Sequence, residues 1–196
     1  MRVSWQSLYD EIYACEKCGL CRQIHNKVPG QGDIHAKLMF IGEGPGADED
    51  MQGLAFVGAA GQLLTKMIAA MGYEREQVYI CNIVKCRPPH NRTPEPLEAQ
   101  TCLPYLRQQV ALVRPRVIVL LGATAARTLL REDFRITREH GIWVERKGVW
   151  FMPTYHPAAL LRDESKKREA WRDLQKVMEK MKEIGEEASD GGHESL

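Results

Sequence analysis

Four short runs of apolar residues punctuate the chain, and each has the length of a buried strand. They are rich in Val, Ile, Leu and Phe and span residues 37–42, 78–84, 117–121 and 149–153. Short apolar runs of this composition are typical of strands that are buried on both faces. The pattern therefore predicts four strands at the centre of the molecule.

Helical patterns follow three of these runs. Residues 61–71 place their Leu, Ile and Met side chains on one face of a helix. The next helix is expected to begin near Thr93, a suitable N-cap, with Pro94 at its first position. A third helix is expected over residues 123–130.

The alternation of strands and helices predicts the fold class, because parallel strands are joined by right-handed crossovers through helices. We expect an α/β fold, a three-layer α/β/α domain with a central, mainly parallel four-stranded sheet. Ligands of such sheets bind beyond the carboxyl ends of the strands. A long charged helix is expected over residues 165–183, and residues 184–196, rich in Glu, Gly and Ser, are expected to be a disordered tail.

Length, composition and charge restrict the number of domains and the kinds of partner that the chain can have. A chain of 196 residues with 44% hydrophobic content suits one sizeable core and is short for two full domains. The formal net charge of +1 indicates no global positive field, so attraction to DNA would need a local patch. The longest apolar run, 117–126, is about half the length of a membrane span. No secretory signal is recognisable at the N-terminus, so no membrane association and a cytoplasmic, intracellular location are expected.

The chain contains six cysteines, which in an intracellular protein favour metal ligation or burial over disulfides. They are Cys15, Cys18, Cys21, Cys81, Cys86 and Cys102. The first three have the two-residue spacing that lets thiolates face one metal, but a ferredoxin-like run would need a fourth cysteine shortly after Cys21. A zinc ribbon made from Cys15, Cys18, Cys81 and Cys86 stays open, and so does plain burial, which suits Cys81 within its strand.

Polar residues stand where the predicted strands end. Residues 42–46, Gly-Glu-Gly-Pro-Gly, allow close approach of the backbone to a ligand and bring the Glu43 carboxylate to the sheet edge. They match neither a phosphate loop nor a dinucleotide fingerprint, and a plain tight turn fits this loop equally well. His156 follows the last strand and precedes a proline, a position that faces a ligand, although a lone histidine is usually structural.

Taken together, these segments resemble the family 4 uracil-DNA glycosylases, within the uracil-DNA glycosylase superfamily. The matching pieces are residues 42–46, Phe-Val-Gly at 56–58, Asn82, Cys-Arg-Pro-Pro at 86–89, Asn-Arg-Thr-Pro at 91–94 and His-Pro-Ala-Ala-Leu at 156–160. Their order and spacing over nearly the whole folded chain make the resemblance specific. It implies a DNA repair enzyme that hydrolyses the N-glycosidic bond of uracil in DNA and leaves an abasic site.

The resemblance also implies a 4Fe-4S cluster, because family members hold one through an N-terminal C-x2-C pair and two later cysteines. The matching ligands are Cys15, Cys18, Cys86 and Cys102, which leaves Cys21 and Cys81 unligated. Residues 1–183 would then form a single glycosylase domain with an N-terminal cluster-binding arm. Uracil excision is redox-neutral, so the cluster is expected to tie this arm to the loop after Cys86.

The implied uracil site consists of residues from several strand ends. They are Gly42, Glu43, Gly44, Phe56, Asn82 and His156. His156 would donate to a uracil oxygen as the base leaves, while Phe56 and the Asn82 amide would stack on and read the flipped-out base. Glu43 is the candidate for orienting or activating water, or alternatively for contacting the base. The sequence departs from better-known superfamily members at Gly44, where those members carry an aspartate.

Other residues are expected to meet the DNA. Arg87 and Arg92 would hold phosphates, and Leu160 matches the apolar wedge that fills the gap left by the flipped nucleotide. His90 lies in the loop where covalent, uracil-DNA cross-linking relatives place a nucleophile, although their longer Arg-rich insertion is absent. The expected partner is uracil-containing DNA, bound by a monomer. The alternatives are cross-linking through His90, a non-catalytic iron-sulfur module that binds DNA, and a zinc-binding structural protein.

Overall fold

A six-stranded sheet forms the centre of the computed structural model, which describes residues 4–190. The strand order is β1-β3-β2-β4-β6-β5. The strands are β1 (Gln31–Gly32), β2 (Leu38–Gly42), β3 (Tyr79–Asn82), β4 (Val117–Leu121), β5 (Val144–Arg146) and β6 (Val149–Thr154). The four inner strands are parallel, and the two edge strands pair antiparallel to them.

The prediction of a mainly parallel sheet is confirmed, but its size of four strands is wrong. The four predicted runs form the four inner strands, β3, β2, β4 and β6. The two edge strands were missed because they are short and only partly buried, with two residues in β1 and three in β5. Strands of this kind carry no apolar run that a sequence pattern can detect.

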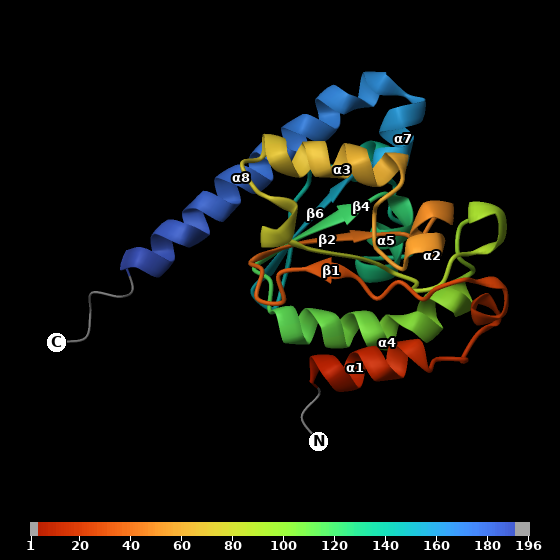
Figure 1. Ribbon diagram of the computed structural model, residues 1–196. Helices are drawn as coiled ribbons and strands as arrows, with labels where there is room; N and C mark the ends of the chain where they lie inside the picture. The colour runs from red at the N-terminus through yellow and green to blue at the C-terminus, as the bar shows by residue number, and fades with distance from the viewer. Residues whose placement is uncertain (1–3, 191–196) are drawn as a thin grey trace.

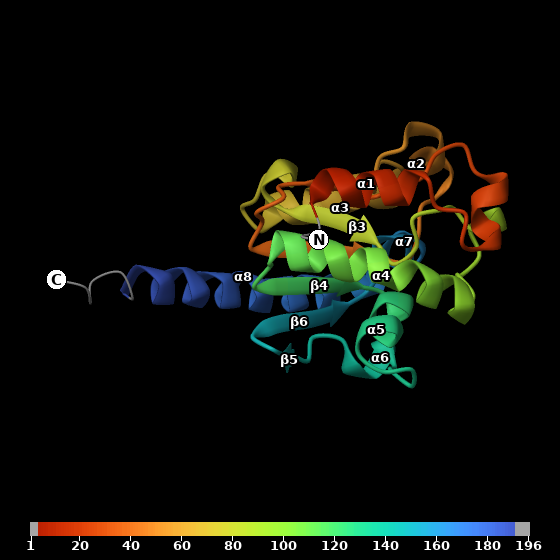
Figure 2. The ribbon, with the colours of Figure 1, turned by 90° about the horizontal axis from the view of Figure 1, so that it is seen from below.

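Helices cover both faces of the sheet, so the three-layer α/β/α architecture is confirmed (Figures 1 and 2). They are α1 (Trp5–Tyr13), α2 (Ala47–Gln52), α3 (Ala59–Ala70), α4 (Pro96–Val113), α5 (Ala123–Leu129), α6 (Ile136–Glu139), α7 (Pro157–Arg162) and α8 (Lys167–Asp190). Helices α3 and α8 pack on one face, and α4 and α5 on the other, with α1 against α4.

Side chains of the inner strands alternate between two apolar cores. In β2, Met39 and Ile41 belong to the core under α4 and α5, whereas Leu38 and Phe40 belong to the core under α3 and α8. All four are at most 1% exposed. Burial on both faces explains why these strands read as continuous apolar runs instead of alternating ones.

Helix α4 begins two residues later than its predicted first position. Its first residue is Pro96 and its N-cap is Glu95, in place of Pro94 and Thr93. A residue that precedes a proline is driven into extended backbone, and Glu95 has ψ of 153°. The second proline of the segment therefore determines where the helix begins.

The last helix continues beyond residue 183, so the expected disorder is wrong for the residues up to Asp190. Ile184 is 5% exposed and packs in the same core as Leu174 and Val177, at helical spacing. This buried side chain extends the helix past the point where composition alone suggested its end. Residues 191–196 of the predicted tail lie outside the described residues.

None of the helices within residues 4–190 combines the length and the apolar character that a membrane crossing requires.

Candidate active site and cysteine pocket

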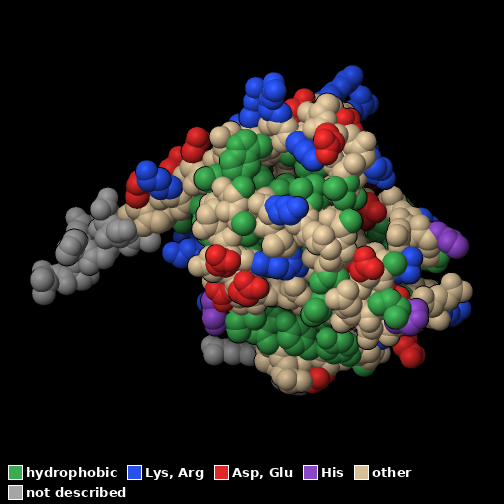
Figure 3. Space-filling view, turned by 45° about the horizontal axis from the view of Figure 1, so that its top comes forward, with side chains coloured by type: hydrophobic (Ala, Val, Ile, Leu, Met, Phe, Trp, Pro, Cys, Tyr) green, Lys and Arg blue, Asp and Glu red, His purple; other side chains and the backbone are tan. Residues whose placement is uncertain are grey.

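A cavity of about 700 Å³ opens at the carboxyl ends of the four inner strands. The predicted residues that line it are Glu43, Gly44, Phe56, Asn82, Arg92 and His156. The parallel sheet brings them together because all of its inner strands end at this edge. Lysines, arginines and acidic residues are interspersed over the face shown in Figure 3, which agrees with the small net charge.

Asn82 is the last residue of β3 and projects into this cavity as a buried amide. The residue is 1% exposed, and its Oδ1 atom accepts no hydrogen bond from any described residue. A buried oxygen without a donor is unfavourable, so the amide is prepared to accept a hydrogen bond from a ligand. Gly42 pairs with Asn82 in the sheet, and a Cβ at Gly42 would lie 2.6 Å from this oxygen. Gly42 therefore does not line the cavity but leaves room for the amide.

Phe56 lies beside His156 on the apolar side of the cavity. The two ring centroids are 5.7 Å apart and the rings are tilted by 32°. Phe56 has a φ of 53°, a left-handed conformation that is unfavourable for a bulky residue. A Cβ at Gly61 would lie 2.0 Å from the Phe56 carbonyl oxygen, so glycine is needed in α3 to accommodate this backbone. The fold thus holds Phe56 in a conformation that it would not adopt freely.

Glu49 holds the two glycine-containing loops together, a role that the sequence did not indicate. The residue is 9% exposed, and its carboxylate accepts hydrogen bonds from the N–H groups of Gly46, Val57 and Gly58 at 2.8–3.0 Å. Both loops border the cavity. The sequence shows here only a run of acidic residues, 48–50, after the first loop, and nothing in that run distinguishes Glu49 from its neighbours.

Glu43 lines the cavity as a half-buried carboxylate. It accepts a hydrogen bond from the hydroxyl of Thr124, which lies in α5 and also lines the cavity. Thr124 thereby orients the Glu43 carboxylate. Sequence reasoning missed Thr124 because nothing in its helical pattern distinguishes it from other surface threonines.

His156 is the N-cap of α7 and has a defined proton position. Its Nδ1 atom accepts a hydrogen bond from the N–H of Ala158 at 3.1 Å, so the neutral ring carries its proton on Nε2. Burial, and to a smaller extent the positive charge of Arg162, lowers the pKa of His156 to about 4. The ring is therefore an uncharged hydrogen-bond donor at neutral pH.

The predicted DNA contacts are placed less favourably. Arg92 borders the cavity, but its guanidinium forms two hydrogen bonds of 2.8 Å with the Glu98 carboxylate. Arg87 donates to Asn91 at 2.7 Å and does not line the cavity. Two arginines that the sequence did not single out, Arg127 and Arg162, do line it.

Leu160 and His90 lie outside the cavity lining. Leu160 is 2% exposed and packs against Tyr155 and Ala170, so its side chain is not available to enter DNA, whereas Leu161 is 46% exposed. Helical periodicity turns Leu160 inward and its neighbour outward. His90 is exposed, with a φ of 55°, in the short loop after β3.

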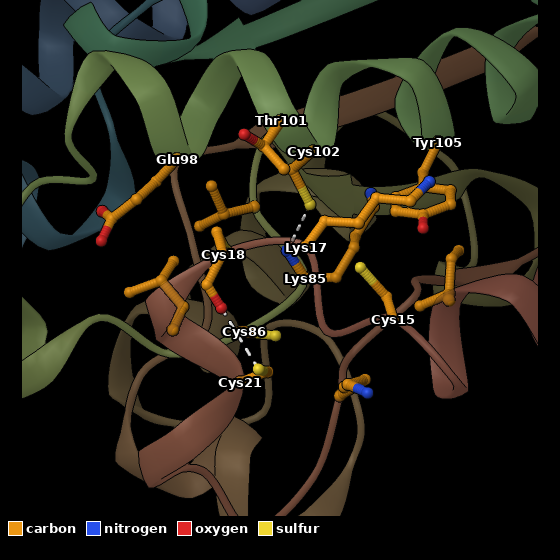
Figure 4. A pocket seen from close by; sticks show the side chains of 14 residues that line it. Cys15, Lys17, Cys18, Cys21, Lys85, Cys86, Glu98, Thr101, Cys102 and Tyr105 are labelled. Atoms are coloured by element: carbon orange, nitrogen blue, oxygen red, sulfur yellow. Dashed lines mark hydrogen bonds between the residues drawn. The ribbon is translucent and has the colours of Figure 1, made fainter.

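A second pocket gathers five of the six cysteines between the N-terminal arm and α4 (Figure 4). They are Cys15, Cys18, Cys21, Cys86 and Cys102. Cys81 is fully buried in β3 and does not line this pocket. None of the six forms a disulfide. The Cys102 sulfur accepts a hydrogen bond from the N–H of Lys85 at 3.3 Å, whereas the Cys21 thiol donates to the carbonyl of Cys18 at 3.2 Å.

The chemistry of this pocket favours a bound cationic group. Burial, and to a smaller extent the charges of Cys102 and Cys18, raises the pKa of Cys86 to about 12. Burial likewise raises the pKa of Cys18 and of Cys102. Without a metal these groups are therefore neutral thiols, and a bound metal would stabilise their thiolate forms. Soft sulfur ligands of this kind suit zinc or iron-sulfur centres. Among the described residues, no three His, Cys, Asp or Glu side chains are arranged to hold a single metal ion.

Comparison with known proteins places these features in a family. The model of the uracil DNA glycosylase superfamily matches residues 29–175. A type-4 uracil-DNA glycosylase of Archaeoglobus fulgidus is 45% identical over 184 residues, which cover 90% of this chain and 92% of that protein. The type-4 enzymes of Sulfurisphaera tokodaii and Thermotoga maritima are 42% and 41% identical, each over 90% of this chain, and over 84% and 94% of their own lengths.

The low pKa of His156 yields a testable prediction. An NMR titration of its ring should give a midpoint near pH 4, in place of the ordinary value of 6.5. The unfolded chain binds a proton at this ring below about pH 6.5, whereas the folded protein binds it only below about pH 4. Between these pH values only the unfolded state is protonated, so this group should lower the free energy of unfolding as the pH falls from 6.5 to 4. A midpoint near 6.5 would contradict the neutral donor.

Proposed function

The chain belongs to the uracil-DNA glycosylase superfamily, and from this premise we infer that it is a DNA repair enzyme that removes uracil from DNA. We propose that it acts as an intracellular monomer and hydrolyses the N-glycosidic bond, leaving an abasic site. Of the alternatives, cross-linking through His90 is not supported by the position of this residue outside the cavity lining.

The observation that carries the proposal is the unpaired Oδ1 atom of Asn82. Uracil presents an N–H donor at N3 and a carbonyl acceptor at C4, which complement the oxygen and the NH₂ group of an amide. Cytosine presents an acceptor and a donor at these positions, so the same amide opposes it. Phe56 provides the aromatic face on which a flipped-out base stacks. The pocket is thus suited to uracil that has left the DNA stack.

His156 and Glu43 are the catalytic residues in this proposal. The bond between N1 of uracil and C1′ of deoxyribose breaks, and its electron pair leaves with the base. The Nε2–H group of His156 donates to the uracil oxygen on which negative charge develops. A water molecule held by Glu43 bonds to C1′ and transfers a proton to the Glu43 carboxylate, which passes it through solvent to the departing uracil anion. Thr124 fixes the orientation of the carboxylate.

We propose a revised DNA-binding face around the cavity. Arg162 lies next to the base site and is exposed, so it joins Arg87 as a candidate phosphate contact. Arg92 positions the loop through its ion pair with Glu98. Leu161 takes the place of Leu160 as the apolar side chain that enters the DNA stack, because it is the exposed one.

We further propose that Cys15, Cys18, Cys86 and Cys102 hold a 4Fe-4S cluster. All four line one pocket, and Cys21 is set apart because its thiol donates to a carbonyl oxygen. When bound, the cluster supplies a cross-link between the N-terminal arm, the loop after β3 and α4.

The first experiment is incubation of the purified protein with a uracil-containing oligonucleotide. Cleavage after alkali treatment, with no retarded band on a denaturing gel without alkali, is the expected result for hydrolytic excision. A retarded protein-DNA band would instead support covalent capture by His90. Binding without either product would favour the non-catalytic module.

Substitution of Asn82 tests the base reader. Asn82→Ala should lower kcat/KM for uracil excision roughly 100-fold, because two hydrogen bonds to the base are lost. Affinity for a uracil-free oligonucleotide should be unchanged, as measured by fluorescence anisotropy. An equal loss in both quantities would remove Asn82 from base recognition.

Substitution of cysteines tests the ligand set. Cys86→Ala should remove iron and the visible absorbance of the cluster and should lower the melting temperature, because the metal stabilises the folded chain. Cys81→Ala is the matched control, since Cys81 is buried outside the pocket. This variant should keep its iron and the visible absorbance of the cluster. Full iron content in Cys86→Ala would exclude Cys86 as a ligand.

A further inference from the structure

Lys85 is a buried lysine that lies between the cysteine pocket and the base site. Its residue is 2% exposed. Its Nζ atom donates to the carbonyl oxygen of Asn82 at 2.7 Å and to Oε1 of Gln109 at 2.6 Å. Its own backbone N–H donates to the Cys102 sulfur, a contact drawn in Figure 4. One residue thus contacts a proposed cluster ligand and the backbone of the proposed base reader.

The ammonium group of Lys85 has no carboxylate partner among the described residues. Its two acceptors are neutral, so they accept two of its three hydrogens without balancing its charge. An unbalanced charge in a protein interior is strongly unfavourable. The nearby groups that can become anionic are thiols. Cys102, whose sulfur accepts a hydrogen bond from the backbone N–H of Lys85, is one of them.

A buried network fixes the position of this ammonium group. Gln109, on α4, is 0% exposed, and its Nε2 atom donates to the carbonyl of Pro29 and to the hydroxyl of Tyr79. The carbonyl of Lys85 accepts a hydrogen bond from the N–H of Val28 at 2.7 Å. Lys85 is therefore held from both its side chain and its backbone, and it cannot turn toward solvent without breaking these contacts.

The residues between Asn82 and Lys85 connect this network to the first glycine loop, residues 42–46. The N–H of Ile83 donates to the carbonyl of Gly42 at 2.9 Å, and the N–H of Val84 donates to the carbonyl of Glu43 at 3.2 Å. A displacement of Lys85 would therefore move the segment that supports both the base reader and the first glycine loop.

We propose that Lys85 is a positioning residue that couples the cysteine pocket to uracil recognition. Its ammonium group is the internal countercharge for the ligated thiolates, which leave a 4Fe-4S cluster with net negative charge. The same group holds the carbonyl of Asn82, and so fixes the backbone from which the reading amide projects. This inference rests on the proposed cysteine ligands and on the proposed role of Asn82.

The test compares Lys85→Met with Lys27→Met in the iron-loaded enzyme. Lys27 also lines the cysteine pocket, but its Nζ atom donates to the carbonyl of Tyr13, away from the base site. Lys85→Met should keep its iron and show a more negative cluster reduction potential, because a positive charge is removed. Its KM for a uracil oligonucleotide should rise about tenfold, the effect of one lost charged hydrogen bond, with unchanged affinity for uracil-free DNA. Lys27→Met should leave KM unchanged.

The proposal is overturned if Lys85→Met retains iron and has the parent potential and the parent KM. If Lys85→Met does not fold, Lys85→Gln keeps an N–H donor without the charge. It should then shift the potential while KM stays near the parent value, and an unchanged potential would overturn the countercharge role. Uracil excision and iron content, both measured on the parent enzyme, distinguish failure of this coupling from failure of the proposed function. A parent that excises uracil but contains no iron refutes the ligand set, and with it this coupling, while the proposed function stands.

Discussion

Burial of the four inner strands on both faces is the constraint on which the rest of this structure depends. Helices cover both sides of the sheet, so the side chains of β2, β3 and β4 are almost entirely apolar along their length. A polar group can therefore meet a ligand where the strands end and the helices have not yet closed over them. Asn82, at the end of β3, and His156, just after β6, lie at this edge.

The site depends on buried polar groups that are held in place by other parts of the chain. Glu49 binds the N–H groups of two loops, and Thr124 orients Glu43 from a different helix. Such contacts are costly to break because each leaves a buried polar atom unpaired. The same principle makes the free oxygen of Asn82 informative, since it is a buried acceptor that the protein itself does not satisfy. Rigid surroundings with one unsatisfied group are what selective recognition of a base requires.

The cysteine pocket and the base site are joined by a short segment of chain. Asn82 ends β3 and Cys86 lines the cysteine pocket four residues later. Lys85 stands between them and contacts both sides. A metal cluster in this pocket would therefore support the base site mechanically and electrostatically, although the excision reaction itself transfers no electrons.

The sequence by itself determined the four inner strands and the helical layers, because apolar runs and helical periodicity are local signals. Strand-end positions and the family resemblance pointed to six residues of the cavity lining, Glu43, Gly44, Phe56, Asn82, Arg92 and His156. Only the tertiary structure decided which side chains are available. It turned Leu160 into the core and Leu161 outward, and it paired Arg92 with Glu98. It also placed Lys85 in contact with both Cys102 and Asn82. Burial, ion pairing and contacts between distant segments are properties of the packed chain, so no pattern of neighbouring residues could reveal them.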